Sequence, residues 1–289
     1  MARGLDHVVH AVHDLDAAAE FYRRAGFTVG ARNRHPWGTH NCIVQLPGFF
    51  VELITVGEPE LIRAGAPGTF SFGAFVRDFL MRGEGLAMLV LEGHGAQEDA
   101  AAFRAAGIGD FKVFGFEREA RRPEGEPVKV AFSLAFATDS KAPEIGYFTC
   151  QQHYPENFWN PAFQQHANGA TGIASVTIVS DRPEDHRPFL SAFTGVDEFK
   201  VGPDGLGLAT ARGGIQLVTP KSYEKFTGNQ APGLAGGARL AALRFWVHDK
   251  AKTQSVLTTN GIPTGERNGA IVVPPDAAFG ATLAFEANR

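Results

Sequence analysis

Blocks of hydrophobic and polar residues repeat four times along the chain. Each repeat opens with an apolar run of strand length, continues into a short amphipathic segment that ends in glycine, and then returns to further apolar runs. The four glycines are Gly26, Gly107, Gly195 and Gly261. Glycine suits this place because the residue that follows a helix often adopts a left-handed backbone. The pattern therefore predicts one helix in each of four equivalent units.

The first unit shows the pattern most clearly. Ala18, Phe21, Tyr22 and Ala25 are spaced i, i+3, i+4 and i+7, which predicts a helix after a cap at Asp14 or Asp16. The predicted strands are 4–13, 27–34, 41–46 and 49–56, the last two joined by a turn at Pro47-Gly48. The unit therefore has the order β-α-β-β-β.

The other units repeat this order and define the predicted fold. Their predicted strands are 86–91, 111–117, 128–137 and 146–150, then 173–179, 199–201, 206–211 and 214–218, then 240–247, 270–273 and 281–285. One such unit leaves a sheet face uncovered, and pairing two units lets their sheets curl around a shared cavity. We predict an α+β fold of four βαβββ modules paired into two cup-shaped mixed-sheet domains. These domains span 1–157 and 170–289, and the aromatic, Pro- and Asn-rich segment 158–169 links them.

Composition narrows the class of protein. Hydrophobic residues make up 44% of the 289 residues and charged residues 20%, as in ordinary soluble proteins. A net charge of -4 without a basic stripe argues against nucleic acid as a partner, and no run of about 20 apolar residues indicates a membrane helix. The charged N-terminus does not resemble a signal peptide. Cys42 and Cys150 form no disulfide framework, so we expect a cytoplasmic protein. No glycine-rich phosphate loop predicts a nucleotide cofactor.

Two strings of the first unit resemble a known superfamily. LDHVVHAVHDLDAAAEFY (5–22) and FFVELITV (49–56) are similar to the vicinal oxygen chelate superfamily, which includes glyoxalase I, extradiol ring-cleaving dioxygenases and bleomycin-resistance-type binding proteins. GTHN (38–41) and FTCQQHYPENFW (148–159) resemble more narrowly the glyoxalase-like domain proteins. The resemblance implies that His7 and Glu52 bind a divalent metal ion such as zinc, nickel, manganese or iron.

The hairpin supports a site at Glu52 by itself. If Pro47-Gly48 is a two-residue turn, Glu52 pairs with Ile43, and Asn41 lies on the same face because side chains alternate along a strand. A carboxylate in an apolar strand is costly to bury unless it is paired or bound to metal. We therefore predict Glu52 and His7 as catalytic residues and metal ligands. The alternatives are a Glu bridged to an arginine and a His hydrogen-bonded in place.

The position of His7 relative to Gly26 can be transferred to the other three units, each of which also has a glycine at the end of its helix. No second pair of metal ligands stands at the equivalent positions. The equivalents of His7 are Met88, Ala174 or Val176, and Ala242, and those of Glu52 are Cys150, Gln216 and about Ala284. Because catalytic metal sites usually have three protein ligands, a further ligand would be His153, His40 or Cys150. The residues predicted to bind substrate are Asn41, Arg32, Arg34, Trp37 and Gln152.

Two functions remain in competition. The first is a metal-dependent isomerase or lyase that acts on a small 2-oxo or hydroxy compound in the N-terminal cup. The second is a metal-free protein that binds and sequesters a small molecule, as in bleomycin resistance. A ring-cleaving dioxygenase ranks below both, because the second half of the chain lacks metal residues. The second half would then cover the first or offer a face for a homodimer.

Overall fold

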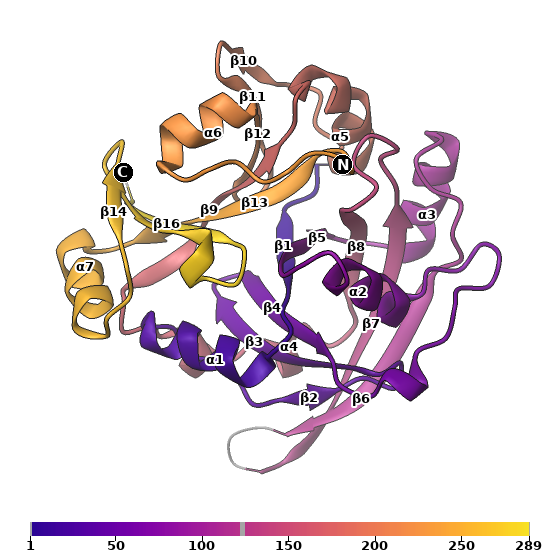
Figure 1. The fold of residues 1–289 in the computed structure, drawn as a ribbon. Coiled ribbons are helices and arrows are strands. Elements are labelled where there is room, and N and C mark those ends of the chain that lie inside the picture. Colours follow the sequence, from indigo (N-terminus) through magenta and orange to yellow (C-terminus); the bar gives the residue numbers. More distant parts are fainter. Residues whose placement is uncertain (1, 122–124, 289) are drawn as a thin grey trace.

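The computed structural model describes residues 2–121 and 125–288, which form two mixed sheets and the helices around them (Figure 1). Each sheet has eight strands in this part of the chain. The first has the order β2-β3-β4-β1-β5-β8-β7-β6 and the second the order β10-β11-β12-β9-β13-β16-β15-β14. Two βαβββ units thus lie side by side in each sheet, and the predicted α+β fold is confirmed.

The central strands of each sheet come from the start of its two units. In the first sheet β1 (Leu5–Ala11) pairs parallel with β4 (Phe49–Val56) and antiparallel with β5 (Gly85–Glu92). Its other strands are β2 (Asn33–Arg34), β3 (Thr39–Leu46), β6 (Phe114–Arg121), β7 (Pro127–Ala137) and β8 (Gly146–Gln152). The second sheet contains β9 (Ala170–Val179), β10 (Lys200–Gly202), β11 (Gly205–Ala209), β12 (Gly214–Val218), β13 (Arg239–Val247), β14 (Gly265–Arg267), β15 (Ala270–Val273) and β16 (Thr282–Ala287).

The four predicted helices are confirmed. They are α1 (Leu15–Arg24), α3 (Ala96–Ala105), α5 (Arg187–Thr194) and α7 (Lys250–Thr259). Asp14 caps α1, and its side chain accepts from the backbone N–H groups of Asp16 and Ala17. The glycine beyond each helix has a positive φ, between 66° and 86°, so the left-handed backbone on which the repeat was recognised is present in all four units.

Some elements differ from the sequence prediction. The helices α2 (Phe72–Leu80), α4 (Pro155–Phe158) and α6 (Pro220–Thr227) and the strand β14 were not predicted, and four short 3-10 turns accompany them: Pro59–Leu61, Pro161–Gln164, Pro183–His186 and Pro275–Ala277. The predicted strand 27–34 is wrong except for Asn33–Arg34. Phe27 turns into the core instead, and Thr28 donates its backbone N–H to His166 of the connecting segment, which keeps this stretch out of the ladder.

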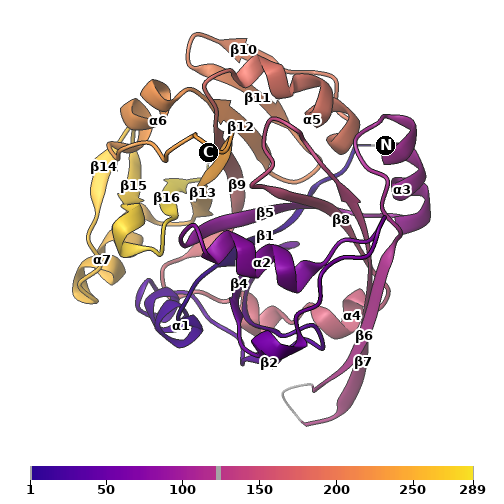
Figure 2. The ribbon, with the colours of Figure 1, turned by 45° about the vertical axis from the view of Figure 1, so that its right-hand side comes forward.

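One apolar core joins the two sheets. Val8 of β1 and Leu89 of β5 face Val176 of β9 and Leu243 of β13 in a single buried cluster. Side chains on the other face of β1, such as Val9, pack in a second cluster inside the first cup. Figures 1 and 2 show β1, β5, β9 and β13 near the centre of the molecule, with α1, α3, α5 and α7 at the periphery. No helix of the described residues is long and apolar enough to cross a membrane.

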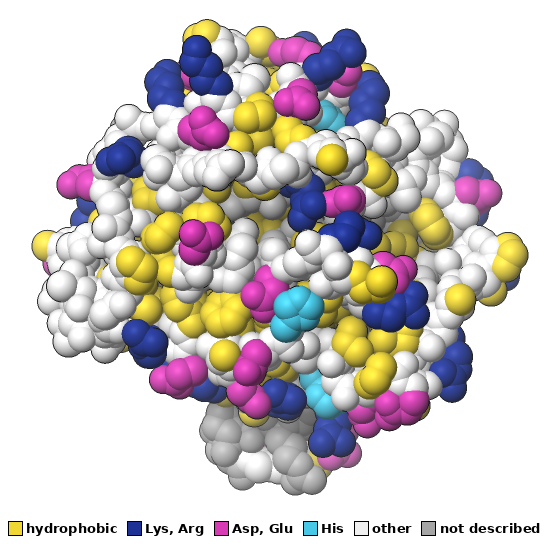
Figure 3. Space-filling view, viewed as in Figure 1, with side chains coloured by type: hydrophobic (Ala, Val, Ile, Leu, Met, Phe, Trp, Pro, Cys, Tyr) yellow, Lys and Arg dark blue, Asp and Glu magenta, His cyan; other side chains and the backbone are white. Residues whose placement is uncertain are grey.

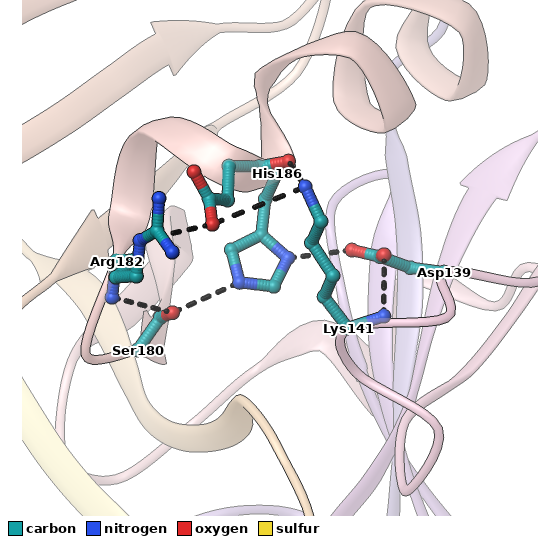
Figure 4. A network of polar contacts seen from close by, with 6 residues as sticks. Asp139, Lys141, Ser180, Arg182 and His186 are labelled. Atoms are coloured by element: carbon teal, nitrogen blue, oxygen red, sulfur yellow. Dashed lines mark hydrogen bonds and ion pairs between the residues drawn. The ribbon is translucent and has the colours of Figure 1, made fainter.

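Two buried histidines connect the halves. His186 donates from Nδ1 to Asp139 Oδ2 over 2.6 Å and contacts Ser180 Oγ with Nε2 over 2.9 Å (Figure 4). His10 lies under α1, with Nε2 2.8 Å from the carbonyl oxygen of Phe279 and Nδ1 3.1 Å from the Tyr22 hydroxyl. Since a carbonyl only accepts, His10 donates from Nε2 and accepts from Tyr22 in its neutral form.

The burial of His10 predicts a loss of stability in acid. Desolvation lowers the pKa of His10 from 6.5 to about 4, so only the unfolded chain binds this proton between those values. Stability from this group is therefore complete above pH 6.5 and falls as the pH drops toward 4, by about 3 kcal/mol in total. Urea unfolding of wild type and His10→Gln at pH 7 and pH 4.5 measures this, and equal pH dependence of the two proteins would contradict it.

Candidate active site

The first cup encloses a small aromatic cavity. Its volume is about 60 Å³, several times the 10–15 Å³ or so that one water needs. Its polar lining consists of His7, His35, Trp37, Asn41, Glu52 and Arg118, and its rings are Phe50, Phe72, Phe116, Phe132, Phe148 and Phe158. An open outer cleft of about 820 Å³ shares Ile43, Arg118 and Phe158 with the cavity, so these three residues form the boundary between them.

Glu52 occupies the place in the hairpin that the register predicts. It pairs with Ile43 across the β3–β4 ladder and is 6% exposed. Asn41 Nδ2 donates to Glu52 Oε1 over 2.5 Å, which holds the carboxylate in the cavity wall. Asn41 Oδ1 in turn accepts from Asn33 Nδ2 at 3.0 Å. The sequence thus placed Asn41 and Glu52 correctly on one face of the sheet.

His7 faces Glu52 and is oriented from behind by Asp6. The Nδ1 atom lies 2.5 Å from Asp6 Oδ2, and Gln152 donates to the other oxygen of Asp6 at 3.0 Å. Because a carboxylate only accepts, Nδ1 carries a proton and Nε2 faces the cavity. His7 Nε2 and Glu52 Oε2 lie 3.9 Å apart, and the ring stacks on Phe50 with centroids 4.1 Å apart. The predicted pair therefore converges in one cavity.

Asp6 is a site residue that sequence reasoning missed. Strict alternation along β1 puts neighbouring side chains on opposite faces. The pairing of β1 with β5 has a register shift between Leu5 and His7, however, and this bulge brings the two neighbouring side chains together. A carboxylate next to the predicted ligand was the only signal in the sequence.

His35 and Trp37 complete the wall next to Asn41. Burial lowers the pKa of His35, and the charge of Arg118 lowers it further, while Glu52 opposes both effects. The ring is therefore neutral near pH 7. Its Nε2 accepts from Asn41 Nδ2 at 3.3 Å, and its Nδ1 donates to Thr39 Oγ1 at 2.9 Å. His35 also stacks on Trp37 with centroids 4.6 Å apart, which fixes the indole in the cavity.

Several predicted residues lie elsewhere. His40 contacts Glu58 at 3.0 Å on the outer face of the hairpin, and His153 contacts Ser133 at 2.8 Å in an exposed position. Arg32 pairs with Asp16, and Arg34 is exposed. The structure does not bring these four side chains to the cavity. His40 and Arg34 point outward from their paired strands, and Arg32 and His153 lie just outside the strands, so the bulge or bend that would turn His40 or His153 inward does not occur.

The ladder corrects two of the equivalences between units. His7 aligns with Phe50 and Val9 with Glu52 on β4, while Met88 aligns with Gly146 and Val90 with Phe148 on β8. Phe148, rather than Cys150, therefore stands at the position of Glu52 in the second unit. Ser175, rather than Ala174 or Val176, is the equivalent of His7 in the third unit. Gln216, Ala242 and Ala284 stand where the sequence predicted them.

The donor set of the cavity does not complete a metal site. His7 and Glu52 are of the right type, and Asp6 accepts from His7 Nδ1 as the carboxylates that orient metal-bound histidines do. Cys150 lines the cavity, but burial raises its pKa well above the usual range, so it stays a thiol. Among the described residues no group of three or more His, Cys, Asp and Glu side chains could hold an ion.

Comparison with known proteins agrees with this architecture. Paired βαβββ units around a polar cavity define the vicinal oxygen chelate class. The family model for the glyoxalase-like domain matches residues 5–194, which include every residue of the cavity. The chain therefore belongs to the glyoxalase-like domain family. No curated protein matches the chain.

Solved structures share the fold at low sequence identity. A hypothetical protein from Staphylococcus aureus is 13% identical, with a TM-score of 0.69 over 99% of this chain and 100% of that one. A variant of 4-hydroxymandelate synthase from Streptomyces coelicolor is 12% identical, with a TM-score of 0.57 over 100% and 94% of the two chains. A fusion of a xylose isomerase-like TIM barrel with 4-hydroxyphenylpyruvate dioxygenase is 11% identical, with a TM-score of 0.52 over 99% of this chain and 49% of that chain.

Proposed function

We propose that this chain is an enzyme that isomerises or cleaves a small 2-oxo or hydroxy compound by moving a proton in the N-terminal cavity. The observation that carries the proposal is the facing pair formed by His7 Nε2 and Glu52 Oε2, 3.9 Å apart. Because Nδ1 donates to Asp6, the neutral form of His7 presents the lone pair of Nε2 to Glu52, and in that form two acceptors face each other. Neither atom then donates a proton to the other, and a bound substrate can supply the proton that lies between them.

The chemistry follows from the surroundings of each group. Glu52 takes the proton from a carbon next to a carbonyl, and the C–H electron pair moves into the enolate. The carbonyl oxygen then carries the negative charge, which His7 stabilises or quenches once Glu52 has passed the proton to Nε2 of His7. Return of the proton to the neighbouring carbon completes an isomerisation, and loss of a leaving group completes a cleavage. The aromatic walls exclude water and strengthen these electrostatic interactions.

A divalent ion would add Lewis-acid stabilisation of the same oxygen. His7 and Glu52 are the side chains that would bind it, but the described residues supply no third ligand of this kind. The acid–base roles of the pair do not depend on such an ion. We propose that the enzyme works in the cytoplasm, where its two free buried cysteines stay reduced.

A metal-free binding protein is the second candidate. Six phenylalanine rings and one indole line the cavity, and such walls suit the sequestration of an apolar compound. The two functions differ in one respect: a sequestering protein binds its ligand without exchanging a proton.

Proton exchange tests the proposed function directly. Incubation of the protein with pyruvate or with neutral hydroxyacetone in D₂O should replace the protons next to the carbonyl by deuterium faster than buffer does, as followed by ¹H NMR. Because the donor set is incomplete, we expect the same exchange rate after treatment with EDTA. Metal analysis accompanies the assay. Exchange at the buffer rate with every compound would favour sequestration, and loss of exchange on chelation would restore a metal-dependent mechanism.

A further inference from the structure

Arg118 brings a positive charge to the boundary of the cavity. It belongs to β6 and lines both the inner cavity and the outer cleft. Burial lowers the pKa of its half-buried guanidinium, while the negative charge of Glu52 in the same cavity acts to raise that pKa, and the arginine remains charged. Its Nη1 donates a hydrogen bond to the backbone carbonyl of Glu119 at the long distance of 3.5 Å. Among the residues that the structure describes, no carboxylate lies within ion-pair distance of it.

A second donor of the cavity also lacks an acceptor. Trp37 Nε1 is buried and has no hydrogen-bond partner in the described part of the chain. Buried donors are nearly always satisfied, and partly buried charges are usually paired. The cavity thus offers a guanidinium that has one long hydrogen bond and no ion-pair partner among the described residues, and an indole N–H that no described acceptor satisfies. This arrangement calls for a ligand that carries acceptor oxygens and a negative charge.

The remaining polar groups of the cavity fix where that charge lies. The Glu52 carboxylate is engaged by Asn41 and faces His7, so an anionic group is repelled from the inner end. Arg118 stands at the outer boundary with Ile43 and Phe158. It is the only Lys or Arg among the described residues that line the cavity or the cleft, so it is the group that attracts a carboxylate, whereas Glu119, Glu126 and Glu156 of the cleft repel one. The planar fork of a guanidinium matches the two oxygens of a carboxylate.

We infer that the ligand of this cavity is a small carboxylic acid, whose carboxylate is bound by Arg118 at the boundary while its neighbouring carbons lie between Glu52 and His7. The cavity of about 60 Å³ limits the inner part to a few heavy atoms, and a longer substituent would extend into the outer cleft. The inference rests on the proposed function for its catalytic meaning, but it concerns binding. Arg118 is the specificity-determining residue that Arg32 and Arg34 were predicted to be.

Equilibrium binding tests the inference with acids and their neutral amides. The probes are pyruvate and lactate against pyruvamide and lactamide, titrated by calorimetry and by tryptophan fluorescence, to which Trp37 in the cavity wall contributes. We expect wild type to bind each acid about 10- to 100-fold more tightly than its amide, as for hydrogen bonds to a charged group. Arg118→Gln should abolish this preference, and Arg118→Lys should keep part of it. Arg32→Gln is the matched control, because Arg32 pairs with Asp16 outside the cavity.

Several results would overturn the inference. These are equal affinity for acid and amide, no binding of either acid by wild type, or an equal effect of Arg118→Gln and Arg32→Gln. The acid–amide comparison in wild type holds even if Arg118→Gln does not fold. The Glu52→Gln protein should still prefer the acids, although it cannot transfer the proton. If the protein exchanged the protons of hydroxyacetone but bound neither acid, only this inference would be wrong. If it bound the acids but exchanged no protons, only the proposed function would be wrong.

Discussion

Replacing Glu52 with glutamine is expected to lower the rate of proton exchange by about 10²- to 10⁴-fold, the usual contribution of a general base. Glutamine keeps the shape of the side chain and an oxygen that accepts from Asn41 Nδ2, so the hairpin stays intact. The amide, however, has no basic oxygen for the proton. The measurement is kcat/KM for deuterium incorporation, together with thermal unfolding to show that the fold is retained.

The matched control for this variant is Glu58→Gln. Glu58 also lies next to a histidine, His40, at 3.0 Å, but on the outer side of the hairpin. We expect its exchange rate to stay within twofold of wild type. If Glu52→Gln retained most of the activity, or if both variants lost it equally, the assignment of Glu52 as the base would be wrong.

The sequence predicted those parts of the fold that depend on local periodicity. The first helix has an apolar stripe and each of the four helices has a glycine beyond its end, and both signals act within a few residues. The hairpin at Pro47-Gly48 fixed the register of β3 and β4, so the contact between Asn41 and Glu52 could be predicted from alternation alone. The prediction of a strand over 27–34 was wrong because it rested on the apolar residues of this segment, and the segment contacts residues that are distant in sequence, such as His166.

The site was predictable only where its residues share one hairpin or one strand. Arg118 comes from the second unit, and chain distance hid its contact with the first. The sequence did contain a signal for Arg118. Phe114, Phe116 and Arg118 are two residues apart and so lie on one face of β6, and an arginine on an otherwise aromatic face is unusual. Asp6 needed a bulge, which periodicity does not reveal. Charge gave little guidance, because basic and acidic side chains are interspersed on the face shown in Figure 3.

The second cup shows what the same fold does without the facing pair. Ser175 and Gln216 stand at the positions of His7 and Glu52, and Ala242 and Ala284 at those of their counterparts in the fourth unit. Arg244, at the position of Val90, forms an ion pair with Glu286 across this cup. Arg244 therefore has an ion-pair partner, whereas Arg118 has none within ion-pair distance among the described residues. The facing pair on which the proposed proton transfer depends thus belongs to the first half alone among the described residues, and the second half contributes the core that supports β1.

A buried hydrogen-bond network outside the cavity connects the two halves. Asp139 follows β7, whereas Ser180 and His186 belong to the third unit (Figure 4). The order Ser–His–Asp matches that of a hydrolase triad. All three residues are at least nine-tenths buried, however, with exposures of 6%, 3% and 7%, so a substrate cannot reach the hydroxyl. The network therefore acts as a polar contact between the halves.

Replacing His186 with alanine is expected to lower the free energy of unfolding by about 3–5 kcal/mol, because the buried carboxylate of Asp139 loses its partner. The control is His153→Ala. His153 also contacts a serine, Ser133 at 2.8 Å, but is exposed, so its loss should cost less than about 1 kcal/mol. Urea unfolding of both variants gives the two values, and the shared core predicts a single transition for wild type. A loss in His186→Ala no larger than in His153→Ala would show that the apolar core alone holds the halves together.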